Sequence, residues 1–148
     1  MRKSFFFNAL MGIVFGLLAF SAPVSGQGQR SPVENVPPVV IDGLDALRQF
    51  GPDEAAKAWS KGSRWEGNSD HSLANKLRSM QESLGAYRSF EILSARPLSA
   101  NTRVIYLTLN YEKEPRFAKL LVYHTAHSWI MLSYYLDGNA DWFQAEPR

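Results

Sequence analysis

The hydrophobic pattern of this chain changes its period once, near Gly85. Before that glycine, apolar residues recur every three or four positions, which is the spacing of one face of a helix. After it they alternate with other residues, which is the spacing of a strand with one buried face. Because helices followed by strands are the order of an α+β domain, the chain is expected to fold as helices packed on a sheet.

Three helices are predicted before Gly85, over about 40–50, 52–61 and 70–84. Proline is favoured in the first turn of a helix and glycine just past its end, and both occur at these boundaries. Ser69 or Asp70 is expected to cap the third helix. The apolar faces are predicted to be Val40, Leu44, Leu47 and Phe50, then Ala55, Ala56, Ala58 and Trp59, then Leu73, Leu77, Met80 and Leu84.

Four strands are predicted after Gly85, over about 87–96, 102–112, 116–125 and 128–136. The short turns between them indicate an antiparallel meander. In the second strand, Ile105, Leu107 and Leu109 are expected to pack under the helices, and Val104, Tyr106 and Thr108 to face outward. In the fourth strand, the same alternation separates Ile130, Leu132 and Leu136 from Trp129, Met131 and Tyr135.

The first 26 residues have the three parts of a secretory signal peptide. Arg2 and Lys3 precede an apolar run, and small residues end at Gly26, after which cleavage is expected. The alternative is a retained membrane anchor, but the apolar run is shorter than the roughly 20 residues that a spanning helix needs. Residues 27–38 are rich in proline and predict a flexible linker, which leaves 39–148 as the folded domain.

Composition excludes several classes of function. The 148 residues contain no cysteine, which excludes disulfides, thiol nucleophiles and cysteine zinc sites. Without Arg2 and Lys3 the chain has 14 basic and 14 acidic residues, so its charge gives no case for nucleic-acid binding. It also has no N-glycosylation sequon. These features favour export to the bacterial periplasm or cell envelope, with no stable membrane anchor after signal cleavage.

The order of elements resembles that of the nuclear transport factor 2-like, or cystatin-like cone, superfamily. Small exported bacterial members of that group are similar in four stretches, which are 51–59, 104–107, 110–112 and 129–130. The resemblance covers roughly 39–136 and includes no catalytic motif, so it predicts fold more strongly than function. It implies three helices packed on a curved, four-stranded antiparallel sheet that encloses a cavity.

Enzymes of that superfamily place a base and a hydrogen-bond donor inside the cone. Side chains of suitable type occur here, but none matches the pattern of those enzymes residue by residue. His124 and His127 flank a turn and His71 is far away in sequence, whereas zinc needs three or four converging ligands. We therefore predict no catalytic residue, no cofactor and no metal. The side chains of suitable type are Glu91, Tyr106, Tyr111, Tyr123, His124, Tyr134 and Asp137.

Two candidate surfaces follow from the aromatic residues. Trp65 lies in a loop bounded by glycines and is expected to cover the open end of the cone, where a small apolar ligand is a candidate occupant. The second surface is the outer sheet face, which is unusually apolar and predicts a homodimer, unless Trp142 and Phe143 cover it. The pocket candidates are Trp65, Tyr111, His124 and Tyr134, and the dimer candidates are Tyr106, Thr108, Trp129, Met131 and Tyr135.

The sequence thus predicts an exported, non-catalytic binding or accessory protein that self-associates. A small isomerase, cyclase or dehydratase that uses the cone cavity is the alternative from another class. A tethered domain is a third possibility if the leader is retained.

Overall fold

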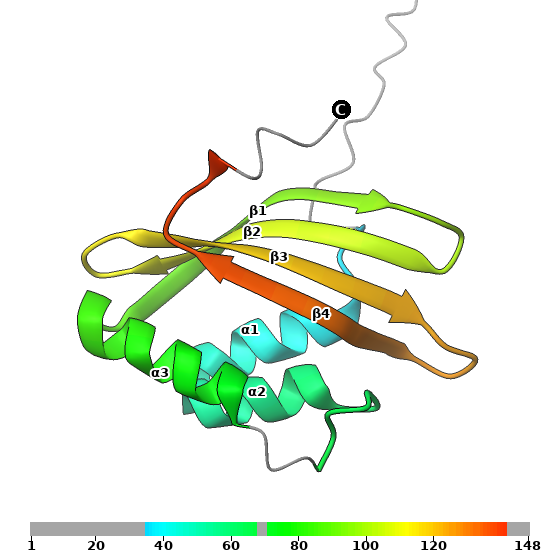
Figure 1. Cartoon of the computed structure of the whole chain (residues 1–148), viewed down its shortest axis with the longest axis horizontal. Helices are drawn as coiled ribbons and strands as arrows, with labels where there is room; N and C mark the ends of the chain where they lie inside the picture. Colours follow the sequence, from blue (N-terminus) through cyan, green and yellow to red (C-terminus); the bar gives the residue numbers. More distant parts are fainter. Residues whose placement is uncertain (1–34, 68–70, 142–148) are drawn as a thin grey trace, which may run out of the picture.

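The computed structural model describes residues 35–67 and 71–141. Three helices lie on one side of a four-stranded antiparallel sheet whose strand order follows the sequence (Figure 1). The prediction of an α+β fold with three helices and four strands is therefore confirmed. The elements are α1 (Pro38–Phe50), α2 (Pro52–Ser60), α3 (Ser72–Leu84), β1 (Tyr87–Pro97), β2 (Thr102–Tyr111), β3 (Pro115–His124) and β4 (Trp129–Asp137).

Proline and glycine set the helix boundaries, as the sequence predicts. Pro38 and Pro52 occupy first-turn positions of α1 and α2, where no backbone N–H donor is needed. Gly51 and Gly85 end α1 and α3 with φ angles of 91° and 84°, a region of backbone conformation that glycine adopts without strain. The N-cap of α3 is His71, whose side chain makes no capping bond, and the predicted caps Ser69 and Asp70 lie outside the described residues.

The core lies between the helices and the inner sheet face. Leu77, Met80 and Leu107 are all buried in this one cluster, so their predicted burial is confirmed. The apolar faces of α1 and α3 are also buried, except that Phe50 is 71% exposed and its predicted place in the α1 stripe is wrong. Phe50 is the last residue of α1, directly before the chain turns at Gly51.

A bulge in β4 changes which side chains point inward. Leu121 pairs with Ser133, but the next residue, Val122, pairs with Met131, so Leu132 is an extra residue without a partner. As a result Met131 is buried in the core and Trp129 packs against it, and the prediction that both face outward is wrong. The predicted inward positions of Ile130 and Leu132 are wrong for the same reason, and Leu132 is exposed.

The fold begins before the predicted boundary at Val39. Val36 packs against the core, and an Arg103 guanidinium nitrogen donates a 2.6 Å hydrogen bond to the carbonyl oxygen of Asn35. The end of the predicted linker therefore belongs to the domain. The signal peptide predicted over 1–26 and the aromatic residues Trp142 and Phe143 lie outside the described residues. Within 35–67 and 71–141, no helix has both the length and the apolar character needed to cross a membrane.

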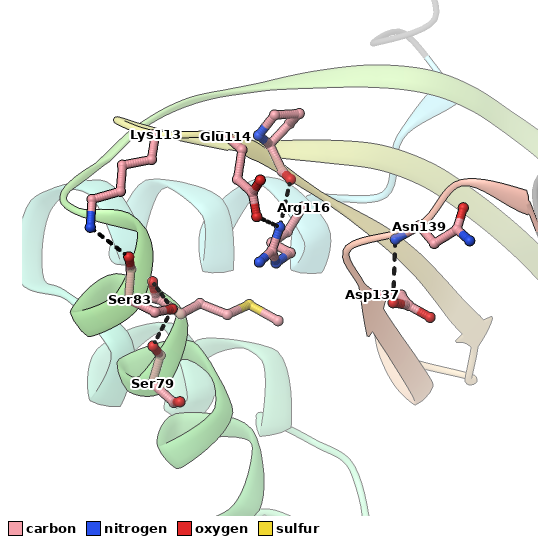
Figure 2. Close-up of polar contacts among 9 residues, drawn as sticks. Ser79, Ser83, Lys113, Glu114, Arg116, Asp137 and Asn139 are labelled. Atoms are coloured by element: carbon pink, nitrogen blue, oxygen red, sulfur yellow. Dashed lines mark hydrogen bonds and ion pairs between the residues drawn. The ribbon is translucent and has the colours of Figure 1, made fainter.

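The C-terminal end of α3 is tied to the turn between β2 and β3. Figure 2 shows the Lys113 ammonium donating to the carbonyl oxygen of Ser83, at 2.8 Å. The backbone N–H of Lys113 also donates to the carbonyl of Leu84, at 3.0 Å. A cation at this position satisfies helix carbonyls that have no partner within the helix and complements the helix dipole. These bonds hold α3 across the end of the sheet where β1 begins.

Candidate functional site

A pocket of about 570 Å³ lies between α2, the start of α3 and β4, and is called here the α2–α3 pocket. Its volume is within the range of small-molecule binding sites. Its apolar wall consists of Ala56, Trp59, Trp65, Leu73, Met131 and Tyr134. Three of these side chains are aromatic: Trp59 and Trp65 are near each other in the sequence, and Tyr134 comes from β4.

Hydrogen bonds within the loop after α2 hold Trp65 at the pocket. The backbone N–H of Gly62 donates to the Glu66 carboxylate at 2.8 Å, and that of Trp65 donates to the Ser63 hydroxyl at 3.1 Å. The same hydroxyl donates to the carbonyl of Ser60 at 2.6 Å. These bonds place the Trp65 ring edge-to-face against Tyr134 of β4, with centroids 6.1 Å apart.

Trp59 forms a rigid part of the same wall. Its side chain is buried, and its indole N–H donates a 3.2 Å bond to the carbonyl of Val40 in α1. A Cβ atom at Gly43 would overlap the indole ring, so the close approach of α1 and α2 requires glycine there. Since its only polar atom is already bonded, Trp59 offers the pocket an apolar surface.

The charged side chains at the pocket are paired with neighbours outside it. Asp53 lies 2.7 Å from an Arg78 guanidinium nitrogen, and the Lys57 ammonium lies 2.5 Å from Glu54. Neither Arg78 nor Glu54 lines the pocket. The hydrogen bond to Glu54 raises the pKa of Lys57. The pocket therefore combines an aromatic wall with a rim whose charges are already matched.

Two of the four predicted pocket residues meet at this site, namely Trp65 and Tyr134. The Tyr134 hydroxyl also lies 3.2 Å from that of Ser72 at the start of α3. His124 is exposed beside Trp129, with ring centroids 4.9 Å apart, and does not line the pocket. His71 and Ser72 also line the pocket and were not predicted to do so, and the signal for them was their position just before the apolar face of α3.

Tyr111 belongs to a second aromatic pair, where β1 begins. Its ring lies edge-to-face against Tyr87, with centroids 5.7 Å apart. Both hydroxyls are buried and have no hydrogen-bond partner within the described part of the chain. Burial raises the pKa of Tyr111 to about 12 and raises the pKa of Tyr87 as well. Neither tyrosine lines the α2–α3 pocket.

The outer sheet face differs from its prediction. Tyr106 and Thr108 face away from the helices, but both are buried within the single chain. Tyr106 lies between the Arg96 and Lys119 side chains, at 5.7 and 5.5 Å from its ring centroid. Of the five dimer candidates, only Tyr135 is widely exposed, at 49%. It lines a groove of about 540 Å³, called here the outer groove, with Leu98, Val104, Lys119, Leu121, Ser133 and Tyr134, the last of which also lines the α2–α3 pocket.

The other candidates for catalysis do not converge on the α2–α3 pocket. Glu91 accepts a 3.4 Å bond from the Asn110 amide, and Asp137 accepts a 2.8 Å bond from the Tyr135 hydroxyl. Tyr123 is partly exposed beside Ile130. Within the described ranges, no three histidine or acidic side chains lie close enough to hold a metal ion.

Comparisons with protein-family models, with curated proteins and with solved structures gave no match to this chain.

Proposed function

We propose that this protein is an exported, non-catalytic binding protein that holds a small apolar ligand in the α2–α3 pocket. The observation that carries the proposal is the pocket itself, which has a volume of about 570 Å³ and a wall of three aromatic rings with Leu73 and Met131. Burying an apolar ligand against such a wall supplies the main favourable free energy of binding.

The environment of the charged groups favours binding over catalysis. A general base in an enzyme pocket usually has a pKa shifted by burial or by a charge inside the pocket. Here the carboxylate of Asp53 and the ammonium of Lys57 are 59% and 70% exposed, and each faces a partner outside the pocket. The buried tyrosines, Tyr87 and Tyr111, lie elsewhere. This arrangement supports the proposal over a small isomerase, cyclase or dehydratase.

The cone architecture and export are parts of the same proposal. Three helices against one face of a four-stranded antiparallel meander agree with the element order of the nuclear transport factor 2-like superfamily. Export rests on the signal-peptide pattern of residues 1–26. Intact-mass analysis of the envelope fraction is expected to find a chain that begins at Gln27. A full-length chain retained in membranes would contradict cleavage and favour the tethered domain.

Ligand binding is tested with the neutral fluorescent probe N-phenyl-1-naphthylamine. Saturable binding is expected, and Trp65→Ala should weaken it about tenfold, because removing a ring from a desolvated contact typically costs about 1–2 kcal/mol or more. The matched control is Leu98→Ala, which removes an exposed apolar side chain from the outer groove. Absence of saturable binding would refute the proposal. An effect of Leu98→Ala alone would move the site to the outer groove.

We also propose that the protein self-associates through the outer sheet face, using the exposed residues Leu98 and Tyr135. Exposed apolar residues around a groove are typical of interaction surfaces. Light scattering of the mature protein should give the mass of a dimer, and Leu98→Arg should give that of a folded monomer, because it places a charge in the contact. A wild-type monomer at high micromolar concentration would refute self-association and leave the ligand proposal unaffected.

A further inference from the structure

The rim of the α2–α3 pocket carries two charged groups whose charges are neutralised from outside the pocket. Lys57 and Asp53 line the pocket, whereas their partners Glu54 and Arg78 do not. The two pairs have opposite polarity with respect to the pocket, since one presents a cation and the other an anion. A ligand beside Lys57 and Asp53 therefore encounters little net charge of either sign.

Three further polar groups of the wall are also engaged. The Trp59 indole N–H is bonded to Val40, and the hydroxyls of Tyr134 and Ser72 lie 3.2 Å apart. A charged ligand group would lose its hydration without gaining an unmatched charge in return, which is unfavourable. An uncharged ring loses only apolar hydration and gains contact with the edge-to-face corner of Trp65 and Tyr134.

We propose that the ligand is an uncharged aromatic molecule, and that Glu54 and Arg78 set this specificity by neutralising Lys57 and Asp53. The inference rests on the proposed function, because it names the ligand class of the same pocket. Glu54 and Arg78 act as specificity-determining residues through their partners, without touching the ligand themselves.

Three probes with one ring system test the charge preference in the mature protein. They are 2-(2-naphthyl)ethanol, 2-naphthylacetate and 2-(2-naphthyl)ethylammonium, measured by titration calorimetry at pH 7. The neutral alcohol is expected to bind at least about fivefold more tightly than either ion, corresponding to about 1 kcal/mol. If an ion binds most tightly, the inference is wrong while the proposed function stands. If no probe binds, both the inference and the proposed function are wrong.

Two variants test the roles of the outer partners. Glu54→Gln removes the carboxylate that pairs most closely with Lys57 and is expected to tighten binding of naphthylacetate about two- to fivefold, the range of exposed ion pairs. Arg78→Gln leaves Asp53 unmatched and is expected to tighten binding of the ammonium probe by a similar factor. Both effects should shrink in 0.5 M salt, because exposed charges are screened. Unchanged preferences in both variants would overturn the assigned roles.

The chain offers a matched control and a second check. Arg48→Gln breaks an exposed ion pair with Asp45 on α1 that does not border the pocket, and it should leave all three affinities unchanged. In the double variant Glu54→Gln with Lys57→Met, the gain for naphthylacetate should disappear. A gain that persists without Lys57 would show that Glu54 acts by general charge and not through its partner, which would overturn the inference.

Discussion

Two aromatic pairs of similar geometry have different surroundings in this protein. Trp65 and Tyr134 lie edge-to-face with centroids 6.1 Å apart, and Tyr87 and Tyr111 do the same at 5.7 Å. The first pair borders the α2–α3 pocket and has its phenol near Ser72. The second pair packs at the core with two buried hydroxyls that lack a partner among the described residues. Similar ring contacts thus border a pocket in one place and pack in the core in the other.

The difference shows what turns aromatic side chains into a candidate site. Space must remain beside the rings, and their polar atoms must be satisfied without the ligand. The loop around Trp65 and the start of α3 border that space. Tyr87 and Tyr111 lie where the start of β1 pairs with the end of β2, and their hydroxyls are buried.

The largest expected effect is a difference in stability between variants of the two aromatic pairs. Tyr111→Ala should lower the free energy of unfolding by about 3–5 kcal/mol, because it removes a large buried ring. Trp65→Ala should lower it by less than about 1 kcal/mol, because its side chain is partly exposed in a loop. Urea melts of both variants provide the measurement. Equal costs would show that the two pairs do not differ in this way.

The next effect concerns the wall that Trp59 forms. Gly43→Ala should cost about 1–3 kcal/mol, because the added Cβ overlaps the indole ring and the two helices must separate. In a Trp59→Leu background the same substitution should cost less, since a smaller side chain relieves the overlap. A double-mutant cycle by urea melts measures this coupling. Independent, additive costs would contradict the contact.

Alkaline pH should destabilise the protein through the second pair. Tyr111 has an ordinary pKa near 10 in the unfolded chain and a pKa of about 12 when folded, so the unfolded state loses its proton first. The contribution of Tyr111 to the free energy of unfolding is therefore fully present below about pH 10. It falls as the pH rises toward 12, by at most about 1.4 kcal/mol per pH unit. Urea melts from pH 9 to 11.5 should show a smaller loss in Tyr111→Phe than in the wild type. Identical losses would refute the assignment.

The smallest expected effects on stability come from removing the hydroxyl of Tyr111 or that of Tyr134. Tyr111→Phe removes a buried hydroxyl that lacks a partner, so it should be neutral or stabilise by up to about 1 kcal/mol. Tyr134→Phe removes a hydroxyl that interacts with Ser72 and should cost about 0.5–1 kcal/mol. Thermal and urea melts of the two variants are the measurement. A clear loss in Tyr111→Phe would indicate that its hydroxyl is hydrogen-bonded in solution.

Much of the fold could be predicted because its signals are local. Proline and glycine mark both ends of α1, and short turns separate the strands. The buried face of α3 follows directly from the helical period. Local signals fail where a single residue alters the period, and the extra residue Leu132 moves Met131 and Trp129 to the inner face. Nothing in the alternation of apolar residues distinguishes a bulge from a regular strand there.

The candidate site was predictable only in part, for a similar reason. A tryptophan between two glycines indicated that Trp65 is presented by a loop, and an aromatic strand made Tyr134 a reasonable candidate. Which tyrosine meets Trp65 depends on the register of β4 against β3 and on the position of α3, and both involve contacts between distant segments. His124 and Tyr111 were equally plausible by residue type, but they lie elsewhere.

The sequence by itself determined the class of fold, the order of its elements and most of the core, because these follow from periodicity and from the backbone limits of proline and glycine. The tertiary structure decided where a pocket remains and which charges on α2 and α3 face one another. It also decided which tyrosine hydroxyls are buried without a hydrogen-bond partner among the described residues. Those properties depend on distances between segments far apart in the chain, since hydrogen bonding, ion pairing and ring packing all act only at short range.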